Sequence, residues 1–136
     1  MQDTHRGQCL CGAISFETEG PLEGLTACHC SQCRRQTGLH YVATRTSMER
    51  LTLHGEDRLQ WYRASETANR GFCSICGSAL FWQADGSPDI SIMAGAFDQP
   101  LGLKVAEHIY CADRGDFYDL PDDQAPRYPG DRPSSG

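Results

Sequence analysis

Seven of the eight cysteines in this 136-residue chain fall into three tight groups. The groups are Cys9-Leu10-Cys11, Cys28-His29-Cys30-Ser31-Gln32-Cys33 and Cys73-Ser74-Ile75-Cys76, while Cys111 stands alone. Thiolates at such short spacings bind soft metal ions, zinc above all. Four disulfides are the alternative, but disulfide frameworks belong to secreted chains, and residues 1–8 lack the apolar core of a signal peptide. We therefore expect a cytoplasmic protein with reduced, metal-binding cysteines.

The third group has the form of a zinc knuckle. Cys73 and Cys76 are followed by Gly77, which lets the backbone curl beneath two sulfurs that share one metal. A redox pair of the thioredoxin type would need a βαβ context, and the sequence shows no such pattern. Structural zinc takes four ligands, and Cys9 and Cys11 supply the missing two if they project from one face of a strand end. We predict a structural zinc held by these four cysteines.

The second group is a compact set of three thiolates. Cys28 and Cys30 share a face if the strand continues through them, and Cys33 returns from the first turn of a short helix. Three protein ligands with one open position is the usual arrangement of catalytic zinc. We therefore predict two zinc ions per chain, the second one catalytic and held by Cys28, Cys30 and Cys33.

A fourth protein ligand would close the second site and make it structural. His29 alternates away from its cysteine neighbours, which makes it a poor ligand. His108 and Cys111 are better candidates, and the sequence leaves both open. His29, His40 and His108 could also move protons, although for each of them a structural or surface role is favoured.

The remaining pattern predicts a mainly β domain of short antiparallel strands. Gly and Pro interrupt the chain often, with 14 and 7 copies, and only residues 31–37 look helical. Several short segments alternate between apolar and polar residues as half-buried strands do. The expected strands cover residues 13–17, 41–46, 51–54, 59–63, 79–84, 90–93 and 105–110.

Charge and composition indicate which partners are disfavoured and where the domain ends. The net charge is −6, and residues 71–136 hold ten acidic and four basic residues, which argues against nucleic acid as a partner. No segment approaches the apolar length of a membrane span. Residues 1–120 are expected to form one domain. Residues 121–136, rich in Pro and Asp, are expected to form a mobile tail because they can bury little apolar surface.

The cysteine motifs, in this order and spacing, resemble the family of glutathione-dependent formaldehyde-activating enzymes and centromere protein V. The resemblance covers most of residues 7–112. Its segments are Gly7-Gln8-Cys9-Leu10-Cys11-Gly12, Cys28-His29-Cys30-Ser31-Gln32-Cys33-Arg34, Arg70-Gly71-Phe72-Cys73-Ser74-Ile75-Cys76-Gly77-Ser78, Ala94-Gly95-Ala96-Phe97-Asp98 and Glu107-His108-Ile109. The chain departs from the family at Asp116-Phe117-Tyr118, where a tryptophan-containing segment is usual, and it is shorter than the enzymes named for the reaction.

The resemblance implies a "β-tent" domain and the same division of cysteines into a structural and a catalytic zinc site. It also implies a carbon–sulfur lyase that joins glutathione to formaldehyde as S-hydroxymethylglutathione. Arg34 and Arg35, beside the second cysteine group, could pair with carboxylates of glutathione, the expected small-molecule thiol and co-substrate. Two other readings stay open: a non-catalytic zinc module with two structural sites, and a redox or metal-buffering protein. The sequence sets neither the substrate nor the oligomeric state.

Overall fold

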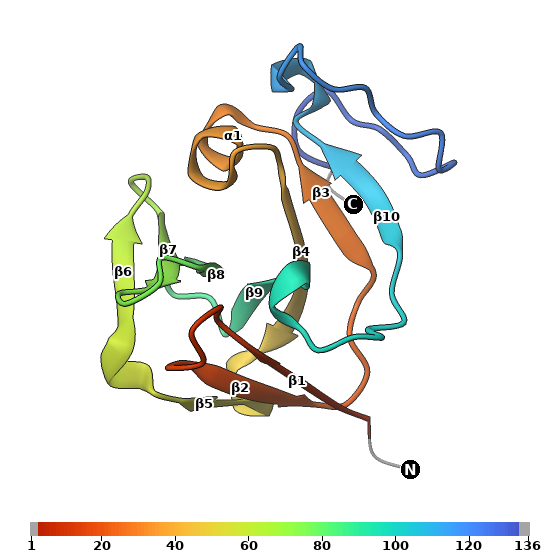
Figure 1. Cartoon of the computed structure of the whole chain (residues 1–136). Helices are drawn as coiled ribbons and strands as arrows, with labels where there is room; N and C mark the ends of the chain where they lie inside the picture. Colours follow the sequence, from red (N-terminus) through yellow and green to blue (C-terminus); the bar gives the residue numbers. More distant parts are fainter. Residues whose placement is uncertain (1–2, 134–136) are drawn as a thin grey trace. The chain divides into compact units, whose positions relative to one another are not determined.

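The computed structural model describes residues 3–133, and the fold is mainly β, as predicted (Figure 1). Residues 1–2 of the predicted domain and 134–136 of the predicted tail lie outside the described residues. The strands are β1 (Thr4–Gln8), β2 (Ser15–Glu19), β3 (Leu25–Cys28), β4 (Tyr41–Ser47), β5 (Leu51–His54), β6 (Leu59–Arg63), β7 (Ala68–Cys73), β8 (Ala79–Ala84), β9 (Asp89–Met93) and β10 (Val105–Ile109). The single α-helix of this range, α1 (Ser31–Thr37), has the predicted bounds. Short 3-10 turns cover Met48–Arg50, Glu56–Arg58, Ala94–Ala96 and Cys111–Asp113.

The chain divides into two compact units. The first unit contains Met1–Glu23 and Thr44–Gly102, and the second contains Gly24–Ala43 and Leu103–Gly136. The long strand β4 contributes its first three residues to the second unit and the rest to the first. Each cysteine group lies wholly within one unit, so each candidate site can be described from one unit alone.

The first unit contains two sets of strands. In one, β1, β2 and β5 lie side by side and antiparallel, with Gly7 opposite Phe16 and Phe16 opposite Leu53 (Figure 1). In the other, the order is β9-β8-β7-β6, with residues 44–47 of β4 beside β9. Alternation along β2 and β8 points Phe16 and Phe81 into a shared core, where their rings meet edge to face at 5.7 Å. Phe97 packs against Phe16 in the same way at 5.2 Å.

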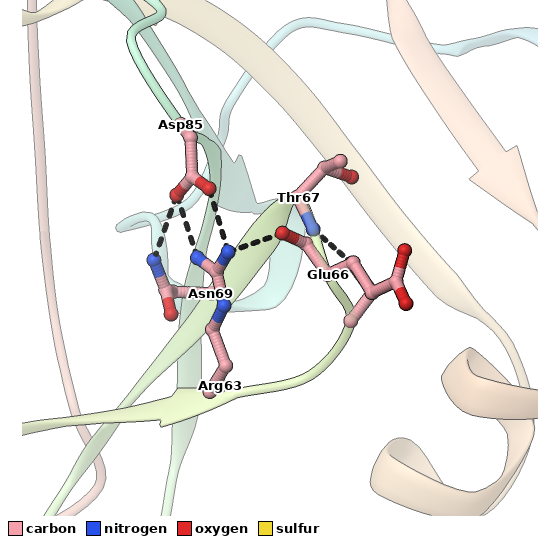
Figure 2. A network of polar contacts seen from close by, with 6 residues as sticks. Arg63, Glu66, Thr67, Asn69 and Asp85 are labelled. Atoms are coloured by element: carbon pink, nitrogen blue, oxygen red, sulfur yellow. Dashed lines mark hydrogen bonds and ion pairs between the residues drawn. The ribbon is translucent and has the colours of Figure 1, made fainter.

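A polar network closes the exposed end of the β6–β7 hairpin. Arg63 donates two hydrogen bonds to the Asp85 carboxylate, at 2.6 and 2.7 Å, and one to the backbone carbonyl of Glu66 (Figure 2). The hydrogen bond from Arg63 holds the pKa of Asp85 below its usual value. Asn69 also donates to this carboxylate, at 3.5 Å. Because both charged side chains are about half exposed, the network organises the hairpin more than it stabilises the fold.

The second unit is built on β3, which lies between two neighbours. Residues 41–43 of β4 pair with it antiparallel, with Cys28 opposite Tyr41, and β10 pairs with it on the other side. The β10–β3 pairing is parallel, whereas the β3–β4 pairing is antiparallel. A parallel neighbour requires a long crossover, and here residues 29–104 separate the two strands.

Residues 126–130 run along the free side of β10 (Figure 1). The His108 N–H donates to the Pro126 carbonyl at 2.9 Å, and the Tyr128 N–H donates back to the His108 carbonyl at 2.9 Å. Arg132 forms an ion pair with Glu107. The expected mobility of residues 121–136 stays a prediction. Movement of this segment away from β10 would require the hydrogen bonds of residues 126–130 and the Arg132–Glu107 ion pair to break. Among residues 3–133, none of the helices has both the length and the apolar character that crossing a membrane demands.

Candidate metal centres

The first cysteine cluster joins two turns of the first unit. Cys9 directly follows β1 and Cys11 lies in the next turn, while Cys73 ends β7 and Cys76 lies in the turn after it. The four Sγ atoms all lie within 4.8 Å of one another. The Cys9–Cys11 and Cys11–Cys73 Sγ distances are 3.7 and 3.8 Å. Four bonds of about 2.3 Å in a tetrahedron place sulfurs about 3.8 Å apart, so this set fits a zinc ion.

The two turns of this cluster hold their sulfurs in the same manner. Gly12 and Gly77 have φ angles of 82° and 81°, which favour glycine, and each donates its N–H to the carbonyl of the first cysteine of its pair. Backbone N–H groups also point at the sulfurs: Ile14 donates to Cys9 Sγ, and Cys76 to Cys73 Sγ, each at 3.4 Å. Donors of this kind stabilise thiolates, as around structural zinc.

Ser78 supports the thiolate form of Cys76. Its hydroxyl lies 3.2 Å from the Cys76 Sγ, and hydrogen bonding from Ser78 lowers the pKa of Cys76 to about 5. The Ser78 hydroxyl also accepts the Leu10 N–H at 2.9 Å, which ties the two turns together. Ser78 ends the Arg70–Ser78 segment of the sequence resemblance, but its hydrogen bonds with Cys76 and Leu10 are evident only in the structure.

The second cluster lies where β3 passes into α1. Cys28 is the last residue of β3, Cys30 is the N-cap of α1, and Cys33 lies buried in the first turn. The three Sγ atoms lie within 4.8 Å of one another, and those of Cys30 and Cys33 are 3.3 Å apart. Cys30 Sγ also accepts the Cys33 N–H at 3.3 Å. Hydrogen bonding with Cys28 and Cys33 lowers the pKa of Cys30, which favours its thiolate form.

The predicted strand geometry of the two C-x-C pairs is wrong, although the sulfurs do converge. Cys9 and Cys11 lie beyond the end of β1, and Cys30 belongs to the helix cap rather than to β3. Turns bring the sulfurs together where a shared strand face was expected. A cysteine at an N-cap accepts a backbone N–H as a serine would, which begins the helix at Ser31.

The residues that could close the second site are otherwise engaged. His108 Nδ1 lies 3.0 Å from His29 Nε2, and His108 Nε2 lies 2.8 Å from Asp123 Oδ2. His29 Nδ1 in turn lies 2.7 Å from the Tyr118 hydroxyl. Both imidazoles thus have a partner at each ring nitrogen. Cys111 is not part of the three-sulfur group, and within residues 3–133 that group contains no fourth His, Cys, Asp or Glu.

The two buried histidines form a polar centre for the second unit. Each is 1% exposed, and His29 also stacks on His40 with ring centroids 4.6 Å apart and on Tyr118 at 5.6 Å. Burial, together with the nearby imidazoles of His40 and His108, lowers the pKa of His29 to about 4. From the sequence, His29 and His108 were considered separately, and Tyr118 and Asp123 were missed. No local spacing relates these four residues.

Arg34 and Arg35 lie in α1, directly after Cys33. Arg34 is half-buried and Arg35 exposed, and within residues 3–133 neither guanidinium forms an ion pair. Burial raises the pKa of Tyr118, while the charges of Arg114 and Arg34 oppose that shift. Arg34 and Arg114 thus lie near enough to Tyr118 to influence its ionisation.

The structure so far defines a small, mainly β protein with two cysteine clusters of metal-binding type. Residues 4–113 match the family model described as glutathione-dependent formaldehyde-activating enzyme, and the chain belongs to this family. An uncharacterized lyase of Schizosaccharomyces pombe is 26% identical over 117 residues, which span 85% of each chain. A crystal structure of a Rhodobacter sphaeroides protein has the same fold, with a TM-score of 0.58 at 22% identity, covering 90% of this chain and 98% of that one.

Proposed function

We propose that this chain is a zinc-dependent carbon–sulfur lyase that acts on a small thiol adduct, with glutathione and formaldehyde as the model pair. The observation that carries the proposal is the three-sulfur group of Cys28, Cys30 and Cys33, with both His29 and His108 engaged elsewhere. The family and the lyase-named relative support the reaction class. The cluster of Cys9, Cys11, Cys73 and Cys76 would hold a second, structural zinc.

The reaction forms one carbon–sulfur bond and moves one proton. The glutathione sulfur attacks the formaldehyde carbon, and the thiol proton ends on the carbonyl oxygen, which gives S-hydroxymethylglutathione with no other reactant. Zinc at the three-sulfur group would supply a Lewis acid that lowers the pKa of a bound thiol. Because three thiolates would offset both charges of the ion and leave a net −1, such a centre suits holding a thiolate better than making hydroxide.

The chain's own residues have separate tasks in this proposal. The Cys33 N–H and the short helix hold Cys30 at a fixed distance from Cys33, so the three sulfurs need little reorganisation to receive a metal. Arg34 and Arg35 would bind the carboxylates of glutathione, since no acidic partner among residues 3–133 occupies them. Substrate specificity would then come from charge beside the metal, and reactivity from the thiol itself.

Zinc-edge X-ray absorption with and without glutathione tests the proposal. With seven cysteine sulfurs shared by two ions, the average sulfur count per zinc is about 3.5 without substrate and four with a bound thiol. S-methylglutathione, which keeps the carboxylates but lacks a free thiol, is the matched control and should leave the count unchanged. A parallel assay follows adduct formation from glutathione and formaldehyde by NMR, where Cys33→Ser should remove the rate above the uncatalysed reaction. If the three-sulfur site already has four ligands without glutathione and the chain shows no activity, the non-catalytic zinc module would be favoured instead.

A further inference from the structure

His29 is the residue between two of the three sulfur ligands, and it is fixed at three points. Its backbone N–H donates to the Ile109 carbonyl at 3.0 Å, and its ring nitrogens meet Tyr118 and His108 at 2.7 and 3.0 Å. The side chain is 1% exposed. A residue held in this way fixes the backbone on either side of it, and here that backbone carries Cys28 and Cys30.

The hydrogen bonds continue from His29 in one direction to a carboxylate. His108 lies between His29 and Asp123, whose Oδ2 is 2.8 Å from His108 Nε2. The hydrogen bond from His108 holds the pKa of Asp123 below its usual value, so the carboxylate is an acceptor. His108 therefore donates to Asp123. An arrangement in which His29 donates to His108 and the Tyr118 hydroxyl donates to His29 gives each contact one proton.

The two ends of this chain of bonds lie beyond the part that matches the family model. That match ends at residue 113, whereas Tyr118 and Asp123 belong to the C-terminal segment. The segment is itself held in place, because the Arg114 guanidinium donates to the Tyr118 carbonyl at 2.7 Å and residues 126–130 pair with β10. The chain therefore carries, outside the family motifs, two side chains that reach the centre of the second unit.

We infer that Tyr118 and Asp123 are positioning residues of the Cys28/Cys30/Cys33 metal site, which act on it through His108 and His29. The inference rests on the proposed function only in that it takes this site to hold a metal. Loss of either end leaves a buried imidazole nitrogen without a partner, and the strain is relieved by movement of the Cys28–Cys30 segment. Removing such an outer contact typically weakens metal binding about 10- to 100-fold.

Cobalt(II) titration of the full-length chain tests this inference, because thiolate-bound cobalt absorbs visibly and reports ligand geometry. Cys33→Ser provides a reference spectrum for the four-cysteine site, and its difference from the wild-type spectrum gives the three-sulfur site. Tyr118→Phe and Asp123→Ala should each weaken cobalt binding at the three-sulfur site by about tenfold and shift its d–d bands, with no change at the four-cysteine site. The matched controls Tyr62→Phe and Asp122→Ala remove the same groups from exposed positions and should change neither site.

A double-variant cycle distinguishes positioning from general stability. If Tyr118 acts through His29, adding Tyr118→Phe to a His29→Phe chain should not weaken cobalt binding further. Equal weakening at both sites together with a lower melting temperature would overturn the inference in favour of a purely structural role. Unchanged affinity and bands in both variants, with two cobalt ions bound, would overturn it while leaving the proposed function intact. A wild-type chain that binds cobalt at the four-cysteine site alone would overturn both.

Discussion

The Nε2 atom of His29 lies 3.0 Å from the Nδ1 atom of His108, although 78 residues separate the two in the chain. This contact bears on one interpretation that the sequence left open, in which His108 is the fourth ligand of the three-sulfur group. A histidine with both ring nitrogens in hydrogen bonds has no lone pair free for a metal, and His108 also bonds Asp123. The three-sulfur group therefore keeps three ligands in the described part of the chain.

The two cysteine clusters should respond differently to loss of one ligand. Cys73 is fully buried, accepts two backbone N–H groups and joins the core of the first unit, so Cys73→Ser should lower the free energy of unfolding by several kcal/mol. Cys33→Ser should leave a folded chain that holds about one zinc ion less. Thermal melts and elemental analysis of both variants provide the measurement. Equal loss of melting temperature in the two variants would contradict the assignment of separate roles.

The local parts of the fold were readable from sequence, while the long-range polar contacts were not. Residues 31–37 were predicted as the one short helix, and the bounds are confirmed. Strand β7 was missed because Asn69, Arg70 and Gly71 break the apolar alternation, although Arg70 is buried. Strand β1 was missed because Thr4–Gln8 is wholly polar and is stabilised by pairing with β2.

The candidate sites show the same division. Short spacing defined three groups of cysteines, because a turn can bring sulfurs two or three residues apart to one point whatever its exact form. The count of four zinc ligands joined the first group to the third, and the sulfurs of these two groups do lie together. The strand faces assumed for Cys9–Cys11 and Cys28–Cys30 are not the ones observed. The contact of His29 with Tyr118 joins residues 89 apart, and neither side chain stands in a motif that names the other. Such contacts depend on the parallel pairing of β10 with β3, which hydrophobic periodicity does not encode.

Gly7 in β1 should tolerate no side chain. A Cβ atom there would lie well inside van der Waals contact with the Ala96 carbonyl oxygen and the Phe16 ring, both in the first unit. Gly7→Ala should therefore reduce the free energy of unfolding by about 1–3 kcal/mol, as overpacked core positions do. Gly95→Ala is the matched control, because a Cβ at Gly95 meets nothing within 4 Å. Urea denaturation gives both values, and equal stability of the two variants would contradict the close packing of β1 on Ala96.

Arg34 and Arg35 should affect binding of a charged thiol rather than the chemistry. Replacement of both by Gln should raise KM for glutathione about tenfold with little change in kcat, since a charge-assisted hydrogen bond contributes about 1.5 kcal/mol. The KM for 2-mercaptoethanol, which has no carboxylate, should not change. Arg45→Gln is the control because Arg45 pairs with Glu23, 3.6 Å away, in the first unit. A similar rise in KM for both thiols would show that the two arginines act on folding or on the metal instead.

Removal of metal should proceed in two steps that differ in their structural effect. The three-sulfur site offers one ligand fewer, and Cys28 and Cys30 are only half-buried, so a chelator should take its ion first. Far-ultraviolet circular dichroism should stay nearly unchanged through that step. The second ion is held by four sulfurs, and two of them, Cys9 and Cys73, lie in the core of the first unit. Its release should unfold that unit, because the free energy of binding is also free energy of folding.

The measurement is a titration with a chelator in which released zinc and ellipticity are followed together. Cys33→Ser provides the control, since it should show the second step alone. Unfolding during release of the first equivalent would show that the three-sulfur site is also structural.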